Sequence, residues 1–232
     1  MKKAIVIGAS SGIGKELAKI LSKDGYIVGI TARNTKLLEE IKNEHSNISY
    51  IRTMDIAKTD EAMKILHELI QEMDGVDLII ISAGIGHINK DLNWELEKTT
   101  IDTNVYGVTA IINTIMHHFI KQGKGHLVAI SSIVALYGID GNSPAYAATK
   151  AYLSNYLQGL RSKVRSQKLN IHITDIKPGF VDTVMAQGEG LFWVMPVDVA
   201  CNQMYKAIKK KKKDVVVTKR WKLIAFYLKG KR

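Results

Sequence analysis

Ala4-Ile-Val-Ile-Gly8-Ala-Ser-Ser-Gly12-Ile-Gly14 is the stretch of this sequence that decides the fold. Residues 4–7 are apolar and end at a glycine, which is typical of a short strand buried on both faces of a parallel sheet. The following residues place Ile13, Leu17 and Leu21 on one helical stripe. The sequence therefore predicts a strand, a glycine-rich turn and a helix in immediate succession.

This succession predicts a binding site for a dinucleotide. Glycines let the backbone turn tightly and approach a pyrophosphate, and the N-terminus of a helix offers unpaired N–H groups to it. The residues that we expect at this site are Gly8, Ser10, Ser11, Gly12, Ile13 and Gly14. A purely structural glycine turn is the alternative, and the strand and helix on its flanks argue against it.

The rest of the chain alternates between predicted strands and predicted helices. Further strands are predicted at residues 26–31, 48–52, 76–81, 126–130, 170–176 and 214–217. Helices are predicted at residues 36–44, 60–73, 99–122, from residue 146 onward, and at 196–209. This order is typical of an α/β fold, and we expect a single-domain, Rossmann-like, doubly wound parallel sheet with helices on both faces. We expect the domain to span residues 1–217, followed by a basic and apolar C-terminal tail, 218–232.

Composition limits the class of protein. A chain of 232 residues with 46% hydrophobic residues favours one large domain, and no apolar run approaches the ~20 residues needed to cross a bilayer. The single cysteine, Cys201, excludes an intramolecular disulfide and fits a reducing compartment, so we expect a cytoplasmic location. We find no Cys/His cluster with zinc spacing and predict no metal site.

Tyr146-Ala-Ala-Thr-Lys150 carries the candidate chemistry. The tyrosine and the lysine are four residues apart at the start of a helical pattern, so both side chains fall on one helical face. A nearby ammonium favours the phenolate, so we expect Lys150 to lower the pKa of Tyr146. A Tyr-x-x-x-Lys spacing often arises by chance, so by itself it is weak evidence for a catalytic site. The other motifs in the chain strengthen that interpretation.

Together, the glycine spacing GxxxGxG and the Tyr-x-x-x-Lys pair resemble the short-chain dehydrogenase/reductase family. The resemblance covers residues 4–217, with the motifs in the family's order, although Ile7 stands where the family usually has Thr. It implies that Tyr146 is a general acid/base and that Lys150 lowers its pKa and holds the nicotinamide ribose.

The resemblance implies two further catalytic residues. Asn104 matches the family's asparagine, which holds a water in a proton relay, and it lies inside a helical pattern where asparagine is unfavourable. Ser132 matches the family's serine, but it precedes Tyr146 by fourteen residues, one more than usual. Ser131 is therefore the alternative catalytic serine.

The resemblance also implies cofactor contacts further along the chain. These residues are Asp55, Ala83, Gly84, Pro178, Gly179, Val181 and Thr183, together with Tyr146 and Lys150. Asp55 is equally well read as a turn residue. Ser82 replaces the asparagine of the family's Asn-Ala-Gly pattern, and we leave it out of the predicted site.

Ala32-Arg33 favours NADP(H) over NAD(H). Dinucleotide folds that bind NAD place an acid near the end of the second strand for the ribose 2′-hydroxyl, and this chain has Ala32 there instead. Arg33 can pair with a 2′-phosphate through two hydrogen bonds. A solvated loop charge is the alternative interpretation of Arg33.

The positive charge is concentrated in the C-terminal part. Residues 206–232 hold twelve of the 33 Lys and Arg residues and one of the 22 acids, so they account for the whole net charge of +11. The basic residues flank an apolar run at 223–228, which suits either peripheral contact with the inner face of a membrane or packing in a subunit interface. Nucleic-acid binding is a less favoured third interpretation.

These patterns predict an NADPH-dependent oxidoreductase that reduces a carbonyl to an alcohol or catalyses the reverse. Ile111, Met116 and Ile120 widen the apolar stripe of the long helix, which suggests subunit packing in a homodimer or homotetramer. Apolar residues at 185–195 suggest a lid and a small-molecule substrate with an apolar portion. The alternative is a non-catalytic NADPH-binding sensor or a membrane-recruited interaction module.

Overall fold

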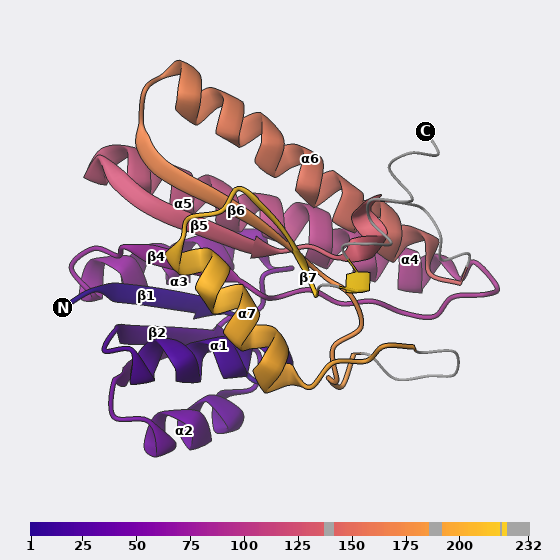
Figure 1. The fold of residues 1–232 in the computed structure, drawn as a ribbon, viewed down its shortest axis with the longest axis horizontal. Coiled ribbons are helices and arrows are strands. Elements are labelled where there is room, and N and C mark those ends of the chain that lie inside the picture. Colours follow the sequence, from indigo (N-terminus) through magenta and orange to yellow (C-terminus); the bar gives the residue numbers. More distant parts are fainter. Residues whose placement is uncertain (137–141, 186–191, 219, 222–232) are drawn as a thin grey trace.

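A computed structural model describes residues 1–136, 142–185, 192–218 and 220–221. In this part of the chain seven parallel strands form one sheet in the order β3-β2-β1-β4-β5-β6-β7 (Figure 1). The strands are β1 Lys3–Ile7, β2 Ile27–Ala32, β3 Ile48–Thr53, β4 Leu78–Ile81, β5 Lys124–Ile130, β6 Asn170–Pro178 and β7 Asp214–Val217. The predicted fold class is confirmed.

Helices cover both faces of the sheet (Figure 1). The α-helices are α1 Gly12–Lys23, α2 Thr35–Glu44, α3 Thr59–Glu72, α4 Trp94–Ile101, α5 Val108–Gln122, α6 Pro144–Ser166 and α7 Val197–Lys209. Along β1, Ala4 and Val6 pack in one core with α1, α2 and α7. Ile5 and Ile7 pack in the other core with α3, α5 and α6. This alternation of apolar side chains explains why the strand is apolar throughout.

The predicted long helix over 99–122 is built differently from the expectation. It starts earlier, at Trp94, because the Asn93 side chain accepts the N–H groups of Glu95 and Leu96 at 2.9 and 3.4 Å. A π-helical segment, Asp102–Gly107, then separates α4 from α5. Single π-helical turns inside α-helices are frequent at functional sites.

The wide apolar stripe of α5 does not provide the second face that we expected for subunit packing. Ile111 and Met116 are 0% and 5% exposed, and both belong to the core shared with α3 and α6. Only Ile120 of the three is exposed, at 40%. The physical reason is that α5 packs on β5 and beside α3, so two of its sides are covered within the chain.

No helix among the described residues is long and apolar enough to cross a bilayer.

His126 makes the stability of the fold sensitive to pH. The side chain is 7% exposed, and its Nε2 lies 2.8 Å from Thr174 Oγ1. Burial lowers the pKa of His126 to about 4, helped by the nearby charges of His172 and Lys211. An unfolded histidine titrates near ~6.5, so the unfolded chain binds more protons and stability falls as the pH drops from about 6.5 towards 4.

We predict that the free energy of unfolding, measured by urea titration, falls by ~2 kcal/mol from His126 alone between about pH 7 and pH 5. His126→Gln removes this part of the pH dependence, whereas His117→Gln, on an exposed position of α5, retains it. Equal pH dependence in wild type and His126→Gln would contradict the assignment.

Candidate functional site

A cavity of about 730 Å³ opens at the carboxyl ends of the strands, where the chain order reverses between β1 and β4. Ligands of open α/β sheets bind at this kind of switch point. Most of the predicted site residues line it: Gly8, Ser10, Ser11, Gly12, Ile13, Arg33, Asp55, Ala83, Gly84, Ser132, Tyr146, Lys150, Pro178, Gly179, Val181 and Thr183. Of the predicted residues, Gly14 and Asn104 are not part of the cavity wall, and both lie behind it.

The glycine turn is required by close backbone contacts. Gly8 has φ +84°, and a Cβ on it would lie 2.5 Å from the Ala83 nitrogen. A Cβ on Gly14 would lie 2.0 Å from the Gly8 carbonyl oxygen. These contacts bring the start of α1 against the end of β1 and beside the loop after β4. The first turn of α1 carries no acidic side chain, so its N–H groups offer an unopposed positive dipole to the cavity.

We predict that Gly14→Ala destabilises the protein by at least ~2 kcal/mol, because the added methyl meets a backbone oxygen that cannot move freely. Gly159→Ala is the matched control, since this glycine lies in α6 with nothing within 4 Å of an added Cβ. Its stability should rise by ~0.5–1 kcal/mol through helix propensity. Thermal unfolding of both variants tests this, and equal effects of the two substitutions would contradict the packing argument.

Arg33 stands at one end of the cavity. It follows Ala32, the last residue of β2, and its exposed side chain forms no hydrogen bond or ion pair with a described residue. Asp55 lies nearby on the cavity wall, where one carboxylate oxygen accepts the Ala57 N–H at 3.0 Å. This hydrogen bond supports the interpretation of Asp55 as a turn residue. The second carboxylate oxygen of Asp55 takes no part in this bond.

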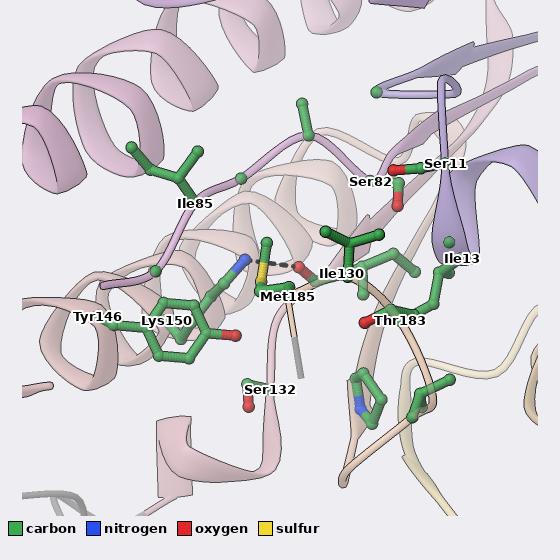
Figure 2. Close-up of a pocket in the computed structure, with 18 of the residues that line it drawn as sticks. Ser11, Ile13, Ser82, Ile85, Ile130, Ser132, Tyr146, Lys150, Thr183 and Met185 are labelled. Atoms are coloured by element: carbon green, nitrogen blue, oxygen red, sulfur yellow. Dashed lines mark hydrogen bonds between the residues drawn. The ribbon is translucent and has the colours of Figure 1, made fainter. Parts of the chain in front are cut away.

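Tyr146 and Lys150 lie one turn apart on α6, on the same side of the helix. Lys150 is 6% exposed, and its ammonium donates to the Ile130 carbonyl at 3.1 Å, the dashed line in Figure 2. The same nitrogen lies 5.6 Å from the centroid of the Tyr146 ring. Burial lowers the pKa of Lys150 to about 8, against the opposing negative charge of Asp175.

The predicted direction of the Tyr146 shift is wrong in this structure. Burial is the largest influence and raises the pKa of Tyr146, while a hydrogen bond from the Ser132 hydroxyl acts in the opposite direction. Desolvation of the phenolate decides the direction, since the Lys150 ammonium is directed to the Ile130 carbonyl. The tyrosine therefore keeps its proton at neutral pH.

The two serines at the end of β5 point to different partners. The Ser131 hydroxyl donates to the Asp175 carboxylate and to the Ile176 carbonyl, which it reaches at 3.2 Å. Ser132 lies beside Tyr146 (Figure 2), and its hydroxyl also accepts the Val134 N–H at 3.3 Å. The geometry places Ser132, not Ser131, at the phenol.

A buried charge network behind Ser131 was not predicted from the sequence. Asp175 is 0% exposed and forms an ion pair with Lys177, which also contacts Asp214 at 2.7 Å. Arg161 on α6 pairs with Asp214 at 3.0 Å. The signal was present, because Asp175 and Lys177 are two residues apart on a strand and therefore share a face. The network joins β5, β6, β7 and α6 directly behind the cavity.

Asn104 sits in the π-helical segment and is 2% exposed. Its amide nitrogen donates to the Ile85 carbonyl at 2.7 Å and to Thr149 Oγ1 at 3.1 Å, and its oxygen accepts the Ile85 N–H at 2.9 Å. Thr149 lies between Tyr146 and Lys150 in α6. Asn104 therefore braces the loop after β4 against the helix that carries Tyr146.

Gly84 leaves a gap that the side chains of Asn104 and Lys150 both border. A Cβ on Gly84 would lie 3.1 Å from Lys150 Nζ and 3.2 Å from Asn104 Oδ1. A side chain at this position would fill the gap between them. The structure thus gives Gly84 a packing role besides the predicted approach to a cofactor.

The segment after β6 forms the remaining wall. Thr183 packs against the glycine turn. A Cβ added to Gly12 would lie 3.0 Å from Thr183 Cγ2. Ser82, which we had left out of the predicted site, lines the cavity, and so do His87 and Trp221, the latter from the predicted tail. The predicted lid at 185–195 is described only in part, because residues 186–191 lie outside the described residues.

Comparison with known proteins gives concordant matches. A profile of the family described as short chain dehydrogenase matches residues 2–191. The dehydrogenase/reductase SDR family member 7B of Danio rerio is 31% identical over 252 aligned residues, which cover 98% of this chain and 80% of that protein.

Two solved structures share the fold. A short-chain dehydrogenase from Sphingobium yanoikuyae, in complex with NADPH, gives a TM-score of 0.83 at 20% identity, covering 99% of this chain and 94% of that chain. The 3-ketoacyl-(acyl-carrier-protein) reductase from Brucella melitensis, complexed with NADH, gives 0.82 at 21% identity, covering 93% of this chain and 96% of that chain.

Proposed function

Since the chain belongs to the short-chain dehydrogenase family and is an oxidoreductase of that family, we propose that it reduces the carbonyl group of a small molecule to an alcohol with NADPH, or catalyses the reverse. One observation carries this proposal. The hydroxyl groups of Tyr146 and Ser132 lie together on the wall of the cavity that also contains the glycine turn (Figure 2). A proton donor and a dinucleotide site therefore share one space.

The residues of the cavity fit a nicotinamide dinucleotide. The close contact between Gly8 and Gly14 holds the N-terminus of α1 at the end of β1, and Ser11 and Gly12 at that N-terminus line the cavity, where a pyrophosphate would bind. Gly84 leaves space beside the Lys150 ammonium, which can hold ribose hydroxyls. Ser10, Ser11 and Asp55 would contact the adenosine half, while Val181 and Thr183 would contact the nicotinamide half.

Arg33 favours the phosphorylated form of the cofactor. Its exposed guanidinium lines the cavity with no acidic partner among the described residues, and Ala32 supplies no carboxylate for a ribose 2′-hydroxyl. The structural relatives named above bind NADPH in one case and NADH in the other, so the proposal of NADP(H) rests on these two residues alone.

In the proposed reaction the bound nicotinamide supplies a hydride to the carbonyl carbon. Tyr146 donates its proton to the carbonyl oxygen as negative charge builds there. Because burial raises the pKa of Tyr146, the phenol is protonated before the reaction, and an alkoxide is basic enough to take that proton. Ser132 donates a second hydrogen bond to the same oxygen.

Lys150 and Asn104 support the proton donor. A pKa of about 8 leaves Lys150 mostly charged at neutral pH, so that it can bind ribose hydroxyls and stabilise the phenolate left after proton transfer. Asn104 keeps one lone pair of its Oδ1 beyond the bond from Ile85. We propose that this oxygen and Lys150 guide the returning proton through the space beside Gly84.

We predict that Tyr146→Phe lowers kcat by ~10²–10⁴-fold, the usual contribution of a general acid, while Kd for NADPH changes less than about threefold. Tyr152→Phe is the matched control, because Tyr152 lies on the same helix, is 38% exposed and is not part of the cavity wall. Steady-state NADPH oxidation and fluorescence titration measure both quantities. Near-normal kcat in Tyr146→Phe would refute the role of the phenol.

We predict that Arg33→Ala weakens NADPH binding by ~10–100-fold, the value of lost hydrogen bonds to a charged group, and leaves NADH binding nearly unchanged. Lys36→Ala, in the first turn of α2 and not on the cavity wall, should change neither. Calorimetric titration with each cofactor tests this. An equal loss for both cofactors, or tighter binding of NADH by the wild type, would contradict the preference.

The extent of the catalytic domain is also a proposal. We propose that the catalytic domain spans residues 1–217, since β7 closes the sheet at Val217, and that 218–232 form an appended basic segment. Lys219 and residues 222–232, which carry the predicted membrane or subunit contact, lie outside the described residues.

A further inference from the structure

Four aromatic side chains from two distant parts of the chain meet beside Gly179. Phe180, Phe192 and Trp193 come from the segment after β6, and Trp221 comes from beyond β7; we refer to these four residues as the aromatic wall. The ring centroid of Trp221 lies 5.5 Å from that of Phe180, 5.2 Å from that of Phe192 and 6.1 Å from that of Trp193. Such separations are those of favourable tilted and edge-to-face ring pairs.

Trp221 anchors this wall. It is 5% exposed, and a Cβ on Gly179 would lie 2.1 Å from its Nε1, so the indole packs directly on the Gly179 backbone. Gly179 is therefore required by the tryptophan as well as by the turn. The indole N–H finds no acceptor among the described residues. Because this N–H is itself buried, the anchor presents the apolar face of its ring rather than its donor.

The wall is held in place before any substrate arrives. The Met195 N–H donates to the Phe180 carbonyl at 3.0 Å, and the Asp182 N–H donates to the Met195 carbonyl at 2.8 Å. Two residues before Met195, Trp193 has φ +53°, a left-handed conformation that is strained for a bulky residue.

Three of the four wall residues line the candidate active-site cavity. Phe180, Phe192 and Trp221 line the same cavity as Tyr146. Phe192 and Trp193 are 50% and 46% exposed, unlike the buried anchor, so their faces are available to a ligand. Met185, 51% exposed, also lines the cavity (Figure 2). The part of the cavity wall that Phe180, Phe192, Trp221 and Met185 form is therefore aromatic and thioether.

We propose that the aromatic wall is the substrate-recognition surface and that it selects carbonyl compounds whose carbonyl is attached to a flat, apolar ring. This inference rests on the proposed carbonyl chemistry. A flat ring can stack on or meet the edge of Phe192, which lines the cavity, while its carbonyl oxygen reaches Tyr146 and Ser132 in the same cavity. A polyhydroxylated substrate would lose hydrogen bonds to water at this surface without replacement.

The test compares three methyl ketones of equal carbon number: phenyl, cyclohexyl and linear alkyl. We expect kcat/KM of the wild type to be about tenfold higher for the phenyl ketone than for the linear one, the size of a favourable ring–ring contact. Phe192→Ala and Trp221→Ala should each abolish this preference. Because Phe192 is half exposed and its truncation spares the core, the thermal unfolding midpoint of Phe192→Ala should stay close to that of the wild type.

Trp94→Ala is the matched control, because Trp94 is 64% exposed at the start of α4 and does not line the cavity. It should leave the preference intact. Equal or faster turnover of the linear ketone by the wild type would overturn the inference, and so would a phenyl preference that persists in both wall variants.

A binding measurement separates this inference from the proposed reaction. Calorimetric titration with the phenyl alcohol, in the presence of NADPH, reports recognition without turnover, because the reduced cofactor cannot accept a hydride from the alcohol. If no ketone is reduced but the alcohol binds to the wild type and not to Phe192→Ala, the reaction is wrong and the wall stands. If ketones are reduced but the alcohol binds both proteins equally, the wall is wrong and the reaction stands.

Discussion

The contact between Gly14 and the Gly8 carbonyl is the constraint on which the cleft depends. A Cβ at position 14 would lie 2.0 Å from that oxygen, so only glycine allows α1 to begin this close to the end of β1. The same turn brings Gly8 against the Ala83 backbone, which fixes β4 and the loop that Asn104 braces. Through Thr149, Asn104 in turn positions α6 and its phenol. A backbone contact at one end of the cavity thus sets the geometry at the other.

Burial controls the electrostatics of this cavity. It raises the pKa of Tyr146 and lowers the pKa of Lys150, and each shift is opposed by one polar neighbour, Ser132 for the phenol and Asp175 for the ammonium. Asp175 can act in this way because Lys177 and the Ser131 hydroxyl compensate its own burial. The two serines therefore have different partners. Ser132 faces the Tyr146 phenol, and Ser131 donates a hydrogen bond to the Asp175 carboxylate.

The sequence predicted the fold almost completely, because short apolar runs that alternate with helical patterns are typical of a parallel sheet covered by helices. It also predicted most of the cavity lining, because motif residues follow strand ends. Two kinds of feature escaped it. The pKa of Tyr146 depends on burial, which a spacing of four residues does not report. Trp221 reaches the cavity from beyond β7, and only the three-dimensional packing on Gly179 reveals that contact. The π-helical turn at Asn104 likewise has no periodic signal of its own.

The central claim is that one cavity holds both the hydride donor and the proton donor of a carbonyl reduction. The most direct measurement uses NADPH deuterated at the transferable position of the nicotinamide ring, with a phenyl methyl ketone, and examines the product by mass spectrometry and NMR. The account predicts one deuterium on the carbinol carbon and a single enantiomer of the alcohol, since the ketone is held between Tyr146 and the aromatic wall. Oxidation of the cofactor without deuterium in the alcohol, or an unchanged ketone with every carbonyl tested, would contradict it.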